Sequence, residues 1–253
     1  MAPSPPKPDV SSDGPIDGQC EVPDGARAAA GDSRPVRSSQ TGVHERLVEL
    51  VERHARTPWR APLHGASVEA FGQAAAWRDR RGTDRPLVLD TGCGTGESTR
   101  RLAERHPDAL VLGIDQSAAR LRRVGAAEDF AAEGNVAWVR AELATAWRLV
   151  REAGWPVSHQ YLLYPNPWPK PGHVQRRWHG HPVFPTILAV GGRLELRSNW
   201  RIYLDEFRLA LETLGQGPSA PAALGSERDA LTPFERKYTA SGHVLWRLEC
   251  TLT

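Results

Sequence analysis

The stretch that decides the fold is Pro86–Glu97, PLVLDTGCGTGE. It begins with Leu87–Leu89, a short apolar run typical of a strand buried on both faces of a sheet. The run ends in three glycines at alternate positions, Gly92, Gly94 and Gly96, and a helix is expected directly after them. A glycine turn between a strand and a helix lets the backbone approach a nucleotide closely, because no Cβ stands in the way.

An acid follows this turn at the distance that nucleotide binding requires. A second strand is expected at Ala109–Ile114, and it ends in Asp115, 19 residues after Gly96. A carboxylate at the tip of the second strand can accept hydrogen bonds from both hydroxyls of a ribose. The glycine spacing is G-x-G-x-G, whereas the dinucleotide fingerprint has G-x-G-x-x-G. The arrangement resembles the S-adenosylmethionine (SAM) site of class I methyltransferases; the alternative is a tight turn in another α/β enzyme.

The first forty residues differ in composition from the rest of the 253-residue chain. They hold seven Pro, four Gly and six Ser, and only four large aliphatic residues. Such a stretch buries too little apolar surface to offset its ordering entropy, so residues 1–40 are expected to be a disordered tail. They also lack the continuous apolar core of a secretory signal. Residues 41–253 are long enough for a single α/β domain.

The composition also limits which kinds of partner and compartment are expected. No run approaches the ~20 apolar residues that cross a bilayer, so no membrane partner is expected. The cysteines Cys20, Cys93 and Cys250 form no C-x-x-C pair, which favours a reducing cytoplasm, and no cluster has metal-ligand spacing. Between Lys170 and Arg201 six Lys and Arg stand against one acid. This stretch is a candidate phosphate-binding surface, and the alternative is a solvated helix face.

Strands and helices alternate along residues 41–253. An amphipathic helix is expected over 41–56, then a loop and a helix over 57–81 that cover the cofactor pocket. Further helices are expected over 98–105, 117–127, 143–153, 184–190 and 202–214. Further strands are expected at 135–140, 159–164 and 192–197, with a loop at 217–225 and an antiparallel edge strand at 244–252. This order predicts a Rossmann-like α/β fold: a mostly parallel central sheet with helices on both faces and an antiparallel edge strand.

Two further candidate residues follow strands. Glu142 stands at the end of the third strand and can reach the adenine edge of a nucleotide, because ligands lie beyond the carboxyl ends of parallel strands. Asn166 lies in a loop with three prolines in five residues, which fix the backbone directly after the fourth strand. Its carbonyl can accept a hydrogen bond from a base, and Trp168 offers a stacking face. The alternative is that Asn166 only caps its own backbone.

The same loop opens a longer motif. Residues 165–177, PNPWPKPGHVQRR, resemble the P-D-P-W-x-K-x-x-H-x-x-R-R signature of the tRNA (guanine-N7) methyltransferases. T-P-F-E at 232–235 resembles the T-x-[FY]-E element of that family, and S-N-W at 198–200 resembles its T-D-W. The elements occur in the family's order from about Val43 to the C-terminus, so the resemblance covers the whole expected domain.

The resemblance implies an enzyme that transfers a methyl group from SAM to N7 of a guanine in tRNA, the variable-loop guanine at tRNA position 46. The residues that it implies for SAM binding are Asp90, Gly92, Gly94, Gly96, Asp115, Glu142 and Asn166. Those that it implies for catalysis are Asn166, His173 and Arg176. Those that it implies for tRNA binding are Lys170, Arg176, Asn199, Thr232 and Glu235. The chain departs from the family in two ways: Asn166 and Asn199 replace carboxylates, and DTGCGTG replaces the usual E-I-G-F-G-x-G.

Two other functions stay open at this point. Asn-Pro-x-aromatic loops also occur in methylases of exocyclic amino groups, so the enzyme could act on another RNA base. A third possibility is an RNA-binding paralogue without catalysis, although a pure binder has no need of the glycine turn and Asp115. The retained K-x-x-H-x-x-R-R pattern favours N7 methylation over the amino-group alternative. Both a monomer and a homodimer are compatible with the sequence.

Overall fold

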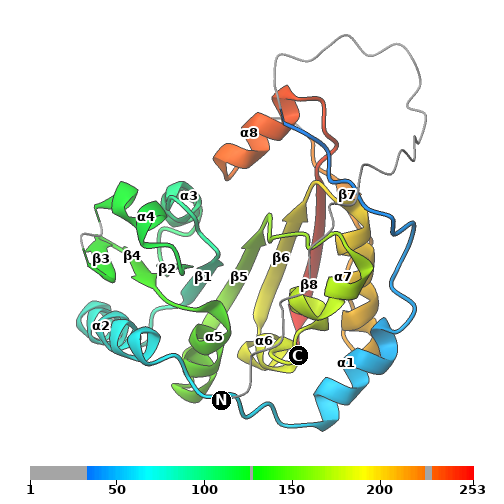
Figure 1. Cartoon of the computed structure of the whole chain (residues 1–253). Helices are drawn as coiled ribbons and strands as arrows, with labels where there is room; N and C mark the ends of the chain where they lie inside the picture. The colour runs from blue at the N-terminus through cyan, green and yellow to red at the C-terminus, as the bar shows by residue number, and fades with distance from the viewer. Residues whose placement is uncertain (1–32, 126–127, 226–229) are drawn as a thin grey trace, which may run out of the picture.

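The computed structural model describes residues 33–125, 128–225 and 230–253. The strands in these ranges are β1 (Leu87–Thr91), β2 (Leu110–Asp115), β3 (Phe130–Glu133), β4 (Val136–Arg140), β5 (Val157–Leu163), β6 (Gly192–Ser198), β7 (Ala222–Ala223) and β8 (Trp246–Leu252). They form one sheet in the order β3-β4-β2-β1-β5-β6-β8-β7 (Figure 1). Strands β4, β2, β1, β5 and β6 are parallel, whereas β3, β8 and β7 are antiparallel to their neighbours. The predicted Rossmann-like α/β fold is confirmed.

The α-helices of the described ranges are α1 (Leu47–Arg56), α2 (Gly65–Arg81), α3 (Glu97–Arg105), α4 (Ala118–Leu121), α5 (Leu143–Glu152), α6 (Phe184–Val190), α7 (Arg201–Thr213) and α8 (Pro233–Ala240). Three short 3-10 helices are η1 (Arg122–Val124), η2 (Pro171–Arg176) and η3 (Trp178–Gly180). Within this part of the chain, no helix is long and apolar enough to cross a membrane. The same residues contain no group of His, Cys, Asp and Glu that could hold a metal ion.

Helices cover both faces of the sheet. Successive side chains of a strand point to opposite faces, so each central strand packs against helices on both sides. In β1, Leu87 and Leu89 pack with buried residues of α2 and α5, whereas Val88 packs in a separate core with Leu102 of α3. A third core joins α1, α6 and α7 to β5, β6 and β8. Every residue of β1 and β2 is buried, as expected for central strands of a parallel sheet.

Several expected elements differ in the structure. The helix expected over 117–127 is only one turn of α-helix followed by η1, because Gly125 takes a φ of +81° and ends it; residues 126–127 lie outside the described residues. Strands β3 and β7 were not predicted, since FAAE and AA carry too little apolar pattern to show a strand. Strand β8 is antiparallel as predicted. It is not the edge strand along its whole length, because the two-residue strand β7 pairs with part of its outer side. Helix α8 was also missed.

Residues 33–40 of the expected tail belong to the part of the chain that the structure describes, and they contact the folded domain. Ser33 donates its N–H to Ser241 Oγ at 3.2 Å, and Ser38 Oγ donates to the carbonyl of Pro169 at 2.5 Å. Figure 1 shows this segment, in blue, starting beside α8 and running to α1. Polar contacts with the folded part hold it, which a measure of apolar content cannot detect. The remainder of the expected tail, residues 1–32, lies outside the described residues, and α1 begins at Leu47, six residues after its expected start.

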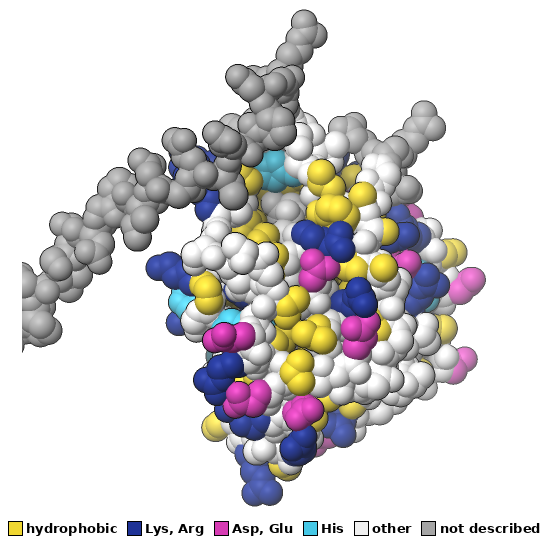
Figure 2. All heavy atoms as spheres, turned by 90° about the vertical axis from the view of Figure 1, so that its right-hand side faces the viewer, with side chains coloured by type: hydrophobic (Ala, Val, Ile, Leu, Met, Phe, Trp, Pro, Cys, Tyr) yellow, Lys and Arg dark blue, Asp and Glu magenta, His cyan; other side chains and the backbone are white. Residues whose placement is uncertain are grey.

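The basic stretch from Lys170 to Arg201 does not form one patch. Arg177 and Arg197 are buried. Arg193 forms an ion pair with Glu249 at 2.8 Å, and Arg201 forms one with Asp205 at 2.9 Å. On the face formed by α1 and α7, basic and acidic side chains alternate (Figure 2). Salt bridges one helical turn apart account for this pattern on both helices. Lys170 and Arg176 remain exposed without an ion pair among the described residues.

Candidate active site

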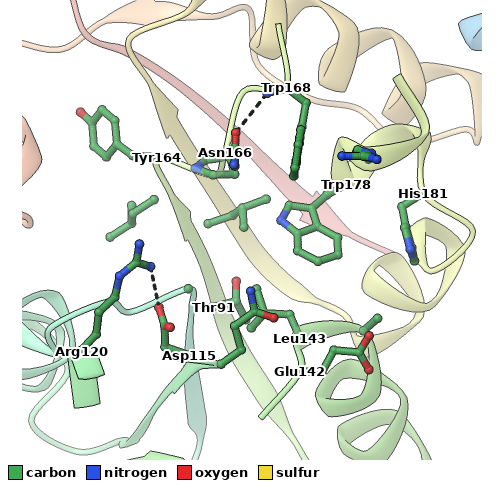
Figure 3. A pocket seen from close by; sticks show the side chains of 17 residues that line it. Thr91, Asp115, Arg120, Glu142, Leu143, Tyr164, Asn166, Trp168, Trp178 and His181 are labelled. Atoms are coloured by element: carbon green, nitrogen blue, oxygen red, sulfur yellow. Dashed lines mark hydrogen bonds and ion pairs between the residues drawn. The ribbon is translucent and has the colours of Figure 1, made fainter. Parts of the chain in front are cut away.

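A cavity of about 410 Å³ lies at the carboxyl ends of β1, β2, β4 and β5 (Figure 3). The chain leaves β1 for β2 on one side and reaches β5 on the other, so the cavity lies at the switch point of the sheet, where α/β proteins bind ligands. Its volume falls within the range of small-molecule sites. Its lining residues are Thr91, Gly92, Asp115, Gln116, Arg120, Glu142, Leu143, Ala144, Leu162, Leu163, Tyr164, Pro165, Asn166, Trp168, Arg176, Trp178 and His181.

The glycine turn is held against the end of β2 by Asp115. Gly94 donates its N–H to Asp115 Oδ2 at 2.9 Å, and Ser117 donates its N–H to Oδ1 at 2.8 Å. Arg120 Nη1 lies 3.5 Å from Oδ2 and closes one end of the cavity (Figure 3). The Asp115 carboxylate lines the cavity in a fixed orientation, next to Gly92 at a φ of +84°.

Gly96 acts behind the turn and does not line the cavity. It has a φ of +74° and precedes α3. A Cβ at this position would lie 2.4 Å from Val124 Cγ1 and 2.6 Å from Trp138 Nε1. Gly96 therefore lets α3 approach the sheet closely, which is the packing role of the last glycine in nucleotide-binding turns.

Asp90 also lies behind the cavity wall. Its Oδ2 accepts hydrogen bonds from Ser98 Oγ at 2.6 Å and Thr99 Oγ1 at 2.8 Å, which tie β1 to the first turn of α3. Burial raises the pKa of Asp90 to about 6; the two hydroxyls oppose this shift and the nearby charge of Asp115 adds to it. Asp90 thus supports the turn from behind, outside the set of cavity-lining residues.

Glu142 lies at the opposite end of the cavity from Arg120, near His181 (Figure 3). It follows β4 and precedes α5, as expected. Its backbone N–H donates to Ser67 Oγ of α2 at 2.9 Å, and its Oε2 accepts from Thr145 Oγ1 at 2.6 Å. Helix α2 therefore positions Glu142 from behind; contrary to expectation, no residue of 57–81 lines the cavity.

The proline loop forms the wall opposite Asp115 (Figure 3). Tyr164 (φ +53°) and Trp168 (φ +45°) flank it, and they are the two non-glycine residues of the described chain with positive φ. Such conformations cost roughly 1–3 kcal/mol each and persist where surrounding contacts impose them. Asn166 Oδ1 accepts a hydrogen bond from the N–H of Trp168 at 3.3 Å, so Asn166 both caps its own loop and lines the cavity. The guanidinium of Arg176 lies 4.7 Å from the centre of the Trp168 ring.

Five of the residues predicted for catalysis or tRNA binding lie outside the cavity wall. The ring centres of His173 and Trp168 lie 5.6 Å apart in a T-shaped arrangement, Lys170 is exposed beyond the loop, and Asn199 Nδ2 lies 3.2 Å from His243 Nδ1. Thr232 and Glu235 are buried in a capping box at the start of α8. Glu235 also pairs with the buried Arg197 at 2.9 Å. The roles of all five toward a substrate stay predictions.

Sequence reasoning missed four residues that shape the cavity: Tyr164, Arg120, Trp178 and His181. Tyr164 ends the stretch expected as the fourth strand, so its place at the ligand edge was available from the sequence. Burial raises its pKa above the ordinary range of a phenol. Trp178 and His181 reach the cavity because η2 and η3 fold the chain back, and no periodicity in the sequence reports that reversal. Burial lowers the pKa of His181, and the nearby His54 adds to this effect.

The sheet order, the glycine turn with Asp115 and the cavity define a Rossmann-like class I methyltransferase fold. Residues 84–248, from before β1 into β8, match the family model Methyltransf_4, described as "Putative methyltransferase". The chain belongs to this methyltransferase family.

Known proteins similar to this chain support the same grouping. It is 31% identical over 175 residues to the tRNA (guanine-N(7)-)-methyltransferase of Leifsonia xyli subsp. xyli (strain CTCB07), covering 66% of this chain and 77% of that one. It is 26% identical over 187 residues to the enzyme of the same name from Brevibacillus brevis (strain 47 / JCM 6285 / NBRC 100599), covering 69% and 85%. Among solved structures, the 16S rRNA methyltransferase KamB matches with a TM-score of 0.52 at 22% identity, covering 71% and 93%, which shows the fold.

Proposed function

We propose that this chain is an enzyme that transfers a methyl group from SAM to N7 of a guanine in tRNA. The observation that carries the proposal is the cavity itself. One wall is the glycine turn held by Asp115, and the facing wall is the Asn166–Trp168 loop of the family signature. Relatives named for this reaction share the sequence over about two thirds of the chain.

The residues present fit SAM. Asp115 is buried at the end of β2, with its carboxylate in the cavity wall where it can accept from ribose hydroxyls. Gly92 leaves the backbone open to the ligand, and Glu142 is available to the adenine end. SAM supplies an electrophilic methyl group when bound. The part of the chain is to hold it in one orientation and to exclude water.

Methylation of guanine N7 makes modest demands on the protein. N7 carries an in-plane lone pair and no proton, so no general base is needed, and rate enhancement comes largely from positioning. The purine becomes cationic as the bond forms, so a carboxylate beside it would stabilise the transition state. Asn166 offers an oxygen without the charge, and hydrogen bonds to neutral groups contribute about 1 kcal/mol against roughly 1.5–3 for charged ones. Glu235 is already paired with Arg197, so we infer that it does not replace the missing carboxylate.

For the tRNA itself, we infer that Lys170 and Arg176 contact phosphates. Both are exposed beside the cavity loop, and neither forms an ion pair among the described residues. An Arg and a Lys at the mouth of a site are suited to positioning a nucleic acid backbone. We further propose that the enzyme works in the cytoplasm, where the free, buried Cys93 and Cys250 stay reduced. A monomer and a homodimer are both compatible with this function.

The test is nucleoside analysis after methyl transfer. Purified protein is incubated with methyl-labelled SAM and an unmodified tRNA transcript, and the tRNA is digested and separated. The proposal predicts label in 7-methylguanosine, with an Asp115→Ala variant as the inactive control. No transfer by a folded protein that binds SAM would overturn it.

A second candidate reaction is favoured by one observation, the amide at Asn166 in place of the family's carboxylate. An amide carbonyl can accept a hydrogen bond from an exocyclic amine, as in base amino-group methylases. The same digest separates the two reactions, because label in an N-methylated amino group would support this candidate and exclude the first.

A further inference from the structure

The second arginine of the Arg176–Arg177 pair points away from the cavity and into the protein. Arg177 is completely buried, whereas Arg176 is exposed. Arg177 Nε and Nη2 donate to the carbonyl oxygen of Trp168 at 3.2 and 3.0 Å, and Nη2 also lies 3.4 Å from the carbonyl of Lys170. The planar guanidinium therefore holds the backbone of the loop that carries Asn166.

Arg177 is itself fixed by groups from two distant parts of the chain. Its Nη1 pairs with Glu206 Oε2 of α7 at 2.5 Å, and its Nη2 donates to Gln40 Oε1 at 2.9 Å. Gln40 Nε2 donates to Glu206 Oε1 at 2.5 Å, and the N–H of His44 donates to the same oxygen at 3.0 Å. All three guanidinium nitrogens of Arg177 and both carboxylate oxygens of Glu206 have hydrogen-bond partners, which is the condition under which a buried ion pair is tolerated.

The electrostatics favour a charged pair. Burial alone would raise the pKa of Glu206, but hydrogen bonds and charges from His179 and Arg177 outweigh it and lower the pKa to about 2. Burial lowers the pKa of His179, the hydrogen bond and charge of Glu206 oppose this shift, and His179 Nε2 lies 2.9 Å from Glu206 Oε2. The cluster thus presents one guanidinium and one carboxylate, locked together beneath the loop.

We propose that Arg177, Glu206 and Gln40 act together as positioning residues that hold the Asn166 loop in its reactive conformation. The proposal rests on the function proposed above for the cavity. The loop is strained at Tyr164 and Trp168, so it needs contacts that impose its shape. The segment from Ser33 to Gln40 has a role on this account: Ser38 holds Pro169, and Gln40 completes the cluster.

Substituting Arg177 by a neutral residue would leave Glu206 buried without its guanidinium and would destabilise the fold, so two milder variants are the test. Gln40→Ala removes the hydrogen bonds of the half-buried Gln40 side chain to Arg177 and Glu206 and keeps the ion pair between those two residues. Arg177→Lys keeps the charge but loses the fork that reaches Trp168 and Gln40 together. Ser39→Ala is the matched control, because Ser39 is an exposed neighbour of Gln40.

Three quantities are measured for each variant: kcat of tRNA methylation, the dissociation constant for SAM and the rate of amide hydrogen exchange. The first two separate a loss of positioning from a loss of the fold. We expect Gln40→Ala and Arg177→Lys to lower kcat by about tenfold or more, because small displacements of a reacting group are costly. We expect SAM affinity within about twofold of wild type, since Asp115 and the glycine turn lie on the facing wall. Amide hydrogen exchange in the peptide covering residues 166–177 should speed up in both variants and stay unchanged in Ser39→Ala.

The outcomes separate this proposal from the proposed function. Wild-type kcat and unchanged exchange in Gln40→Ala and Arg177→Lys would overturn the positioning role, while 7-methylguanosine formation by wild type would still stand. If the wild-type protein methylates no tRNA, the exchange measurement still tests the loop contact. Equal loss of SAM binding and turnover would show a general structural effect and would also reject the proposal.

Discussion

Asn166 sets how much negative charge the cavity can offer to a reacting base. It lines the cavity, but its Oδ1 already accepts a hydrogen bond from Trp168. We predict that Asn166→Asp raises the single-turnover rate of methyl transfer to tRNA by roughly tenfold, since about 1.4 kcal/mol of added charge stabilisation corresponds to one decade. Asn199→Asp is the matched control, because Asn199 lies outside the cavity wall and its change should affect the rate less. Complete loss of activity in Asn166→Asp would contradict this account of the loop.

Asp90 makes stability depend on pH in an unusual direction. Its pKa is raised from 3.8 to about 6, so the folded protein binds more protons than the unfolded chain between these values, and stability falls as pH rises through this window. Asp90→Asn removes this contribution. The free energy of unfolding of wild type relative to Asp90→Asn should fall by up to about 3 kcal/mol between pH 4 and pH 7. Urea unfolding of both proteins at several pH values measures the difference, and parallel pH profiles would refute the buried-carboxyl explanation.

The glycine turn is the element on which the site depends, and its glycines differ in what they do. Gly96→Ala places a Cβ against Val124 and Trp138 at a φ of +74°, so we predict about 3 kcal/mol of destabilisation from strain and overpacking together. Gly94→Ala is the control, because its φ is +58° but nothing lies within 4 Å of the new Cβ, so only about 1 kcal/mol is expected. Denaturant unfolding of the two variants tests the order, and an equal cost would mean that close packing at Gly96 is not the constraint.

The elements that the sequence predicted best are those with a strong local pattern. Strands β1 and β2 are apolar runs that are fully buried. The position of Asp115 at the end of β2 could be predicted from the strand, the glycine turn and the spacing between them. Asn166 lines the cavity in a loop that its prolines fix directly after β5, and the sequence shows those prolines. Strand β3 escaped prediction because its pairing with β4 is made by backbone hydrogen bonds that leave little mark on its side chains. Arg177 was counted with a phosphate-binding surface because only the tertiary structure brings Glu206 and Gln40 to it.

The chain of 253 residues carries a formal net charge of only +2. Attraction to tRNA should therefore depend on a few residues near the cavity and not on a broad field. We predict that Arg176→Ala weakens tRNA binding and reduces the slope of log Kd against log salt by about 1, with SAM affinity unchanged. Arg193→Ala is the control, since Arg193 pairs with Glu249 at the far end of β6. Equal salt slopes for wild type and Arg176→Ala would remove Arg176 from the phosphate contacts.

The central claim is that the cavity at the carboxyl ends of β1, β2, β4 and β5 binds SAM. Isothermal titration calorimetry of the full chain with SAM and with S-adenosylhomocysteine tests it most directly. The affinities of Asp115→Ala and Ser39→Ala are measured at a temperature at which both variants are folded. We predict one site per chain that is retained in Ser39→Ala and weakened at least tenfold in Asp115→Ala, because the ribose loses a carboxylate acceptor. Absence of binding by folded wild-type protein, or equal affinity in Asp115→Ala, would contradict the account.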